Sequence, residues 1–291
     1  MKRSGLASIK ARKAKDKLVY WLVCLFSFLA MIPLFVILYS VISKGYKNFN
    51  LNLFTKVTPS SMDALMAKMY GEPIPGGILN GITGSLLIVG MAILFSLPIG
   101  LSVGVYLSEN HKRKIARTIS FLTDLLQGMP SIVIGIIAYA WVVKPFGGYS
   151  ALAGSIALTI MMLPMIIRST EETLKMLPQS YKEAGLALGS SYRNVVFKIL
   201  IPSGFGGIFT GILLAISRIM GETAPLMLTA LGSSVVNWNA MEPASAIPLL
   251  IWDFYNDPNL VEMVWSSSLL LLIVIFLLNG TAKIVARKWK V

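Results

Sequence analysis

Six long apolar segments constrain what this chain can fold into more than any other feature. A helix that crosses a bilayer needs about 20 mostly apolar residues. Segments near that length cover residues 18–42, 78–107, 119–143, 151–167, 199–220 and 261–284. Lipid offers no hydrogen bonds to the backbone, so a spanning segment must satisfy its own, as a helix does. The sequence therefore predicts an all-α membrane protein with six transmembrane helices.

The composition agrees with this class. Hydrophobic residues make up 55% of the 291 residues and charged residues only 13%, against about 25% charged in soluble domains. That balance excludes an ordinary soluble enzyme and a disordered chain. One cysteine, Cys24, and one histidine, His111, cannot form an intrachain disulfide or a zinc site. We therefore expect neither a metal nor a cofactor.

Lysine and arginine predict the orientation in the membrane. An excess of these residues marks cytoplasmic loops. With six spans and the N-terminus inside, twenty of the 26 fall on the cytoplasmic side and five outside, with Arg218 left within a span. The net charge of +13 is therefore an orientation signal and not a sign of nucleic-acid binding. We expect a multi-pass protein of the cell membrane with both termini cytoplasmic.

The segments between the spans divide the chain further. We expect a basic cytoplasmic N-terminus over residues 1–17, a first transmembrane helix over 18–42, an external loop over 43–77, a core of five transmembrane helices over 78–284 and a cytoplasmic C-terminus over 285–291. Within the core, residues 169–202 are too polar for the bilayer. Apolar residues there recur every three or four positions, which predicts one or two short helices at the cytoplasmic face.

This cytoplasmic segment carries the most specific motif, E-A-G-x3-G-x9-I-x-I-P. Its defining residues are Glu183, Ala184, Gly185, Gly189, Ile199 and Pro202. The pattern resembles the EAA loop of the binding-protein-dependent ABC importer permeases, E-A-A-x3-G-x9-I-x-L-P. The resemblance implies a type I ABC importer permease fold, in which residues 169–202 form a coupling loop whose helix docks on an ATPase subunit. The alternative is an amphipathic connector that only packs on the helix bundle.

A second sequence motif limits the choice of substrate. Residues 218–225 read R-x-x-G-E-T-A-P and resemble the phosphate importer permeases, as does the stretch from Gln127 to Gly135. The resemblance implies a permease subunit of an ATP-driven importer of inorganic phosphate. It also implies a homologous permease subunit (PstC-like), two ATP-binding subunits (PstB-like) and an external phosphate-binding protein (PstS-like). The sequence has no nucleotide-binding G-x-x-x-x-G-K-[ST] motif, so we expect ATP hydrolysis by the partners and no enzymatic activity here.

Arg218 and Glu222 lie four residues apart in an apolar segment, where they can pair on one helix. Ionisable residues within a span are costly and are functional hypotheses by default. A guanidinium also suits phosphate oxygens. We therefore predict that both residues belong to the substrate pathway, with a structural clamp between helices as the alternative. On a straight helix from Ile199, Arg218 would lie about 28 Å along the axis, in the outer half.

Arg168 follows the fourth span directly. Its match to the R-[ST]-x-E string of the family suggests a place at the inner exit for the anion. Its position equally suits an ordinary positive-inside residue, and the two interpretations stay open. Asp124 and Gln127 lie one turn apart near the start of the third span, where we expect them to bond to neighbouring helices.

Two other functions fit the same architecture. A permease for another oxyanion, such as sulfate or molybdate, would share the fold, and the R-x-x-G-E-T-A-P string argues against it. A stand-alone secondary transporter would be expected to carry more charged residues at the membrane midplane. It would also have no use for a docking loop.

Overall fold

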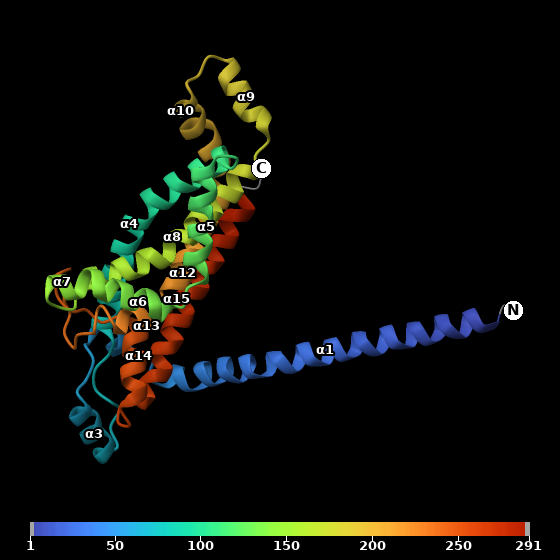
Figure 1. Ribbon diagram of the computed structural model, residues 1–291. Coiled ribbons are helices and arrows are strands. Elements are labelled where there is room, and N and C mark those ends of the chain that lie inside the picture. Colours follow the sequence, from blue (N-terminus) through green and yellow to red (C-terminus); the bar gives the residue numbers. More distant parts are fainter. Residues whose placement is uncertain (1–2, 289–291) are drawn as a thin grey trace.

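The structure is a computed structural model that describes residues 3–288 (Figure 1). Lys2 and Lys290, parts of the predicted basic ends, lie outside the described residues. Over residues 3–288 the chain is helical, apart from loops and one isolated bridge between Leu231 and Ala244. The all-α prediction is therefore confirmed.

Four helices are long and apolar enough to cross a membrane. They belong to α1 (Arg3–Gly45), α4 (Leu79–Asn110), α8 (Ala151–Met176) and α15 (Val261–Lys288). The remaining α-helices are shorter: α2 (Leu51–Thr55), α3 (Ser61–Tyr70), α5 (Lys114–Gly128), α6 (Ser131–Ala138), α7 (Lys144–Phe146), α9 (Gln179–Ala187), α10 (Tyr192–Val195), α11 (Ile201–Ser203), α12 (Phe205–Ile219), α13 (Ala224–Met227) and α14 (Ile247–Asn256).

The third and fifth predicted spans are bent helix pairs. Helix α5 meets the segment from α6 to α7 at 107°, and the segment from α10 to α11 meets α12 at 70°. The described chain reaches six spans only if each bent pair counts as one. The straight fifth helix expected from the sequence is therefore wrong, and Arg218 lies about 20 Å along α12 from Phe205 rather than 28 Å from Ile199.

The two bends have different causes. Met129 between α5 and α6 is extended, with φ −73° and ψ 136°, because Pro130 disfavours the helical conformation of the residue before it. Gly204 between α11 and α12 is buried, and an added Cβ there would lie 3.2 Å from Thr173 Cγ2 of α8. The second bend thus brings the chain directly against α8.

Helix α8 is the centre of the bundle and contacts α4, α5, α6 and α12. Its contact with α4 depends on glycines, which let helices approach closely in lipid. A Cβ added at Gly100 would lie 2.7 Å from Ile166 Cγ2, and one added at Gly104 would lie 2.6 Å from Thr170 Cβ. Any movement of α4 along this seam must therefore involve α8.

Helix α1 leaves this bundle at a steep angle and touches α15 only near its C-terminal end (Figure 1). Its most apolar stretch has no buried residues. An added Cβ at Gly45 would lie 2.6 Å from Trp265 O, so this end is held closely. An apolar helix exposed all round is the arrangement expected where lipid or another membrane helix supplies the contacts.

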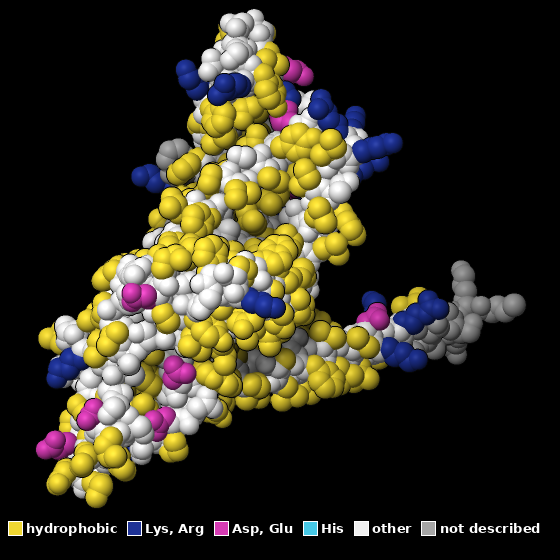
Figure 2. All heavy atoms as spheres, turned by 60° about the vertical axis from the view of Figure 1, so that its left-hand side comes forward, with side chains coloured by type: hydrophobic (Ala, Val, Ile, Leu, Met, Phe, Trp, Pro, Cys, Tyr) yellow, Lys and Arg dark blue, Asp and Glu magenta, His cyan; other side chains and the backbone are white. Residues whose placement is uncertain are grey.

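The two ends of the bundle differ in charge and in structure. Helices α9 and α10 and the C-terminal end of α15 lie at one end, and α3 and α14 lie at the other (Figure 1). Figure 2 shows most of the visible Lys and Arg side chains around the α9 end, and most of the Asp and Glu side chains around the α3 end.

Candidate functional site

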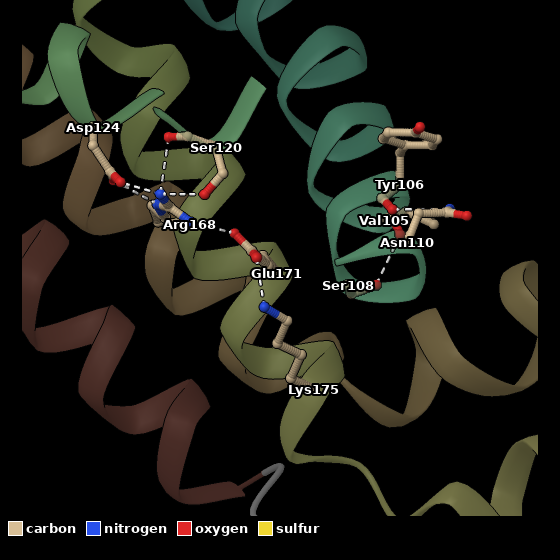
Figure 3. A network of polar contacts seen from close by, with 9 residues as sticks. All are labelled: Val105, Tyr106, Ser108, Asn110, Ser120, Asp124, Arg168, Glu171 and Lys175. Atoms are coloured by element: carbon tan, nitrogen blue, oxygen red, sulfur yellow. Dashed lines mark hydrogen bonds and ion pairs between the residues drawn. The ribbon is translucent and has the colours of Figure 1, made fainter. Parts of the chain in front are cut away.

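Arg168 on α8 forms the densest polar network of the described helices (Figure 3). Its Nε donates to Asp124 Oδ1 at 3.0 Å, and its Nη2 also bonds to that carboxylate. Its Nη1 donates to Glu171 Oε2 at 2.7 Å. Its Nη2 donates further to Ser120, at 2.8 Å to Oγ and 3.0 Å to O. Helix α5 thus supplies one set of acceptors and α8 itself supplies another.

Glu171 continues the network to a second cation. Lys175 Nζ donates to Glu171 Oε1 at 2.6 Å, and only 6% of the Glu171 side chain is exposed. The spacings from Arg168 to Glu171 and from Glu171 to Lys175 are three and four residues, which places all three on one face of α8. With Asp124, two cations meet two carboxylates, so the network is electrically neutral and its arginine is fully bonded.

The helix of the fourth predicted span does not end at Ile167, where the sequence predicted the end of the span. Helix α8 continues for eight more residues after Arg168 to Met176, which is about 12 Å at the rise of an α-helix. The charges that made this stretch look like a loop neutralise one another, so the helix can carry them. Asp124 bonds to Arg168 of a neighbouring helix as expected. Glu171 as a partner of Arg168 and Lys175 as a partner of Glu171 were not predicted from the sequence. Their three- and four-residue spacing was the available signal.

Arg218 lies in the last turn of α12 and has a much looser environment. Its side chain is 46% exposed, and its Nε lies 3.9 Å from Glu222 Oε1. Its Nη1 lies 3.7 Å from Met165 Sδ. Glu222 is not on the same helix, contrary to the sequence prediction, because α12 ends at Ile219 and a turn follows. The two charges are near each other, but they do not form a close ion pair.

The two arginines lie along the same side of α8. Met165, which contacts Arg218, precedes Arg168 by three residues, or about one helical turn. A cavity of about 440 Å³ between α5, α8 and α12 contains both Met165 and Arg168 in its wall. The other lining residues are Asp124, Gln127, Ser169, Glu172, Thr173, Met176, Gly211 and Leu214. Arg218 does not line this cavity itself but touches Met165, one of its wall residues.

The residues of the EAA-like motif divide into two groups. Gly185 is buried in α9, where an added Cβ would lie 2.8 Å from Ile199 Cδ1. These two residues therefore hold the helices of the loop together, which explains a glycine at this position. The second group is exposed and comprises Glu183, Ala184 and Gly189, with Pro202 further along the chain.

Gly189 has a conformational reason to be glycine. Its φ is +78°, and no atom lies within 4 Å of an added Cβ. Glycine adopts this left-handed conformation without strain, so Gly189 turns the chain sharply after α9.

Across residues 3–288, no three His, Cys, Asp or Glu side chains come close enough together to hold a metal ion.

Comparison with known sequences gives consistent matches. The family described as "Binding-protein-dependent transport system inner membrane component" matches residues 96–291. Among curated proteins, the phosphate transport system permease protein PstA of Haemophilus influenzae is 34% identical over 92% of this chain and 92% of its own length. The PstA of Pasteurella multocida is 36% identical over 94% and 95%. The probable PstA of Methanocaldococcus jannaschii is 35% identical over 90% of both chains.

Comparison with solved structures supports the fold. A chain of the MetNI methionine ABC transporter, in an inward-facing conformation, superposes with a TM-score of 0.62 and 21% identity. The match covers 72% of this chain and 95% of that one. A second crystal form of the same transporter gives a TM-score of 0.55 at 19% identity.

Proposed function

The chain belongs to the binding-protein-dependent transport system inner membrane component family, and from this premise we propose the part that it plays in importing inorganic phosphate. It is a multi-pass membrane subunit of an ABC importer and has PstA permeases as its relatives. Phosphate passes along the side of α8 that Arg218 and Arg168 border. Sulfate or molybdate, the other oxyanions that fit a cationic pathway, are outcomes of the test below.

Arg218 is the observation that carries this proposal. A guanidinium in an apolar span is costly unless protein or water meets its charge. Its carboxylate partner lies 3.9 Å away, and nearly half of its side chain is exposed. Donor groups thus remain free to bind the oxygens of an anion. Glu222 lies close enough to weaken that binding by repulsion, which favours release of the phosphate.

Arg168 has a different part in the pathway. Arg168 is already bonded to two carboxylates of the protein itself. A substrate anion can therefore bind the Arg168 guanidinium only if it displaces one of these carboxylates. Asp124 is the carboxylate that can leave most easily, because its side chain is 61% exposed. We assign Arg168 to the inner end of the pathway, where exchange between Asp124 and phosphate controls passage.

The exposed group of the coupling loop suits a docking surface. Glu183 and Ala184 on α9, with Gly189 just beyond it, are free on the surface of the chain. We assign this surface to one of two ATP-binding subunits, whose hydrolysis of ATP supplies the energy. A homologous permease subunit and an external phosphate-binding protein complete the proposed complex. The α9 end and both termini are cytoplasmic in this assignment, in line with the Lys and Arg distribution.

The proposal is tested with the assembled importer in proteoliposomes. Radiolabelled phosphate should enter only with ATP and the binding protein, and excess unlabelled phosphate should compete much better than sulfate or molybdate. Uptake that persists when the ATP-binding subunits are inactivated would overturn the proposal in favour of a stand-alone transporter. Stronger competition by sulfate or molybdate would replace phosphate with another oxyanion.

The docking surface is tested at Gly189. Gly189→Trp places a bulky side chain where the structure has open space, so ATP hydrolysis should no longer drive uptake. The left-handed backbone alone costs a non-glycine residue about 1–2 kcal/mol. Gly189→Asn is the matched control, because asparagine tolerates this conformation with a small side chain. Normal uptake in Gly189→Trp would remove Gly189 from the docking surface.

A further inference from the structure

The C-terminal end of α4 is joined to α9 by three side chains. Lys182 Nζ on α9 forms an ion pair with Glu109 Oε2 on α4. The same nitrogen lies 5.3 Å from the ring centroid of Tyr192 on α10, within the range of a cation–π contact. The Tyr192 hydroxyl also interacts with the Glu109 carboxylate. We call Glu109, Lys182 and Tyr192 the α4–α9 link.

Neither charge of this link suits the helix that carries it. Glu109 is the last residue but one of α4, where the helix dipole favours a cation. Lys182 is the fourth residue of α9, near the end where the dipole favours an anion. Each charge is therefore locally unfavourable and is compensated by the other. Stability of the separate helices does not explain this pair, whereas a contact between them does.

The link lies in the wall of a cavity. A cavity of about 610 Å³ lies between the end of α4, the end of α8 and α9. Its polar wall includes Ser108, Glu109, His111, Lys175, Lys182 and Glu183. The Glu109 side chain is 17% exposed and that of Lys182 is 35% exposed, so water screens this pair less than a pair on the open surface. The ion pair thus bridges two helix ends that the cavity separates.

An apolar cluster lies beside the link and also reaches α4. Its buried members include Leu174, Val195 and Leu200, and Leu101 and Val105 of α4 pack against it. Hydrophobic contacts are non-directional, so they do not by themselves fix the distance between two particular atoms. An ion pair fixes the distance between two atoms. The link is therefore the contact that sets where α9 stands relative to the end of α4.

We propose that the α4–α9 link transmits the movement of the coupling helix to α4, with Glu109 and Lys182 as positioning residues for transport. This inference rests on the proposed function, because it requires an ATP-binding subunit that moves α9. Lys182 directly precedes Glu183 and Ala184 of the docking surface. A movement of the ATP-binding subunit would therefore act on α9 directly beside the link. From α4 it passes through the close contacts of Gly100 and Gly104 to α8, which carries Arg168.

The experiment measures phosphate uptake and ATP hydrolysis in parallel, with the complete importer in proteoliposomes. Glu109→Gln keeps the side-chain shape and Lys182→Gln keeps a polar side chain, and each removes one charge. Both should lower phosphate transported per ATP hydrolysed about three- to thirtyfold, the range of single-residue coupling effects. Lys182→Arg keeps the charge and should retain normal transport per ATP. Lys198→Gln, an exposed lysine of the same loop, is the matched control and should also be normal.

A charge exchange separates positioning from simple structural support. The double variant Glu109→Lys with Lys182→Glu restores the ion pair and places each charge at the helix end that favours it. It should transport more phosphate per ATP than either single variant and approach the wild-type value, because the two changes act on one contact. Failure of this rescue would overturn the proposal.

Folding defects give a different result from uncoupling. If the single variants only reduced the amount of complex, uptake and ATP hydrolysis would fall together and their ratio would stay unchanged, which contradicts the proposal. A wild-type importer that takes up no phosphate would overturn the proposed function itself. Normal wild-type uptake with unchanged ratios in Glu109→Gln and Lys182→Gln would overturn the link alone.

Discussion

Arg168 lies about one helical turn along α8 from Met165, the residue that Arg218 of α12 touches, yet the surroundings of the two arginines are opposite. Arg168 bonds to two carboxylates and to Ser120, and 22% of its side chain is exposed. Arg218 has one carboxylate at 3.9 Å and is 46% exposed. The same residue type thus serves two purposes. A fully bonded arginine holds helices together and gives its charge to an anion only when a carboxylate leaves, while a partly bonded one keeps its charge available for a ligand.

This difference predicts which property each residue controls. Loss of a partner from a buried network leaves an uncompensated charge, which costs stability. Loss of a loose and exposed partner costs little, because water replaces it. Changes around Arg168 should therefore affect assembly first, and changes around Arg218 should affect transport first.

The largest effect on stability is expected for Glu171→Gln. Glu171 is 6% exposed and bonds to both Arg168 and Lys175. Its neutralisation removes the carboxylate that these cations share, and because their side chains are 22% and 43% exposed, the loss should be about 1.5–3 kcal/mol. Thermal unfolding in detergent and the amount of assembled complex measure this effect. Glu172→Gln changes the exposed neighbour and should stay within about 0.5 kcal/mol. Equal losses in both variants would contradict the network's structural role.

A smaller effect is expected for Asp124→Asn. This carboxylate also bonds to Arg168, but its side chain is 61% exposed, so water screens the interaction and can replace it. The variant should lose about 1 kcal/mol at most and remain assembled. The same unfolding measurement checks this value. A loss as large as that of Glu171→Gln would show that both carboxylates support Arg168 equally.

Much of this fold could be predicted from the sequence, because apolar segments of membrane length leave few alternatives. The bends could not be read from hydropathy, since both halves of each bent pair are apolar. Pro130 was a usable signal for the first bend. The second depends on Gly204 meeting Thr173 of α8, a contact between residues distant in the sequence. The direction in which α1 leaves the bundle could not be predicted either, because no local sequence pattern indicates it.

The candidate site could be predicted less well than the fold. Hydropathy placed the end of the fourth span at Ile167, because it treats Arg168, Glu171 and Lys175 as separate charged residues. In the structure they neutralise each other on a continuing helix. The pairing of Arg218 and Glu222 was predicted, but its looseness follows from the end of α12 at Ile219. Helix ends are less readable than helix centres, since they depend on tertiary contacts.

The smallest effect on stability is expected at Arg218, where the effect on transport is decisive. Arg218→Gln should lose about 1 kcal/mol at most, because the pair is loose and Arg218 itself is 46% exposed, although Glu222 is 19% exposed, and it should still assemble with its partners. Phosphate uptake by the importer should nevertheless disappear, because the free guanidinium is gone. Arg287→Gln, an exposed arginine near the end of α15, is the matched control and should transport normally.

The double variant Arg218→Gln with Glu222→Gln tests the central claim most directly. It removes both charges, so no unpaired carboxylate remains near α12. If the pair only held helices together, this variant should regain uptake close to that of the wild type. The pathway role of Arg218 predicts a complex that assembles normally and takes up no radiolabelled phosphate. Recovery of uptake in the double variant would contradict that role and would leave the pair as a structural clamp.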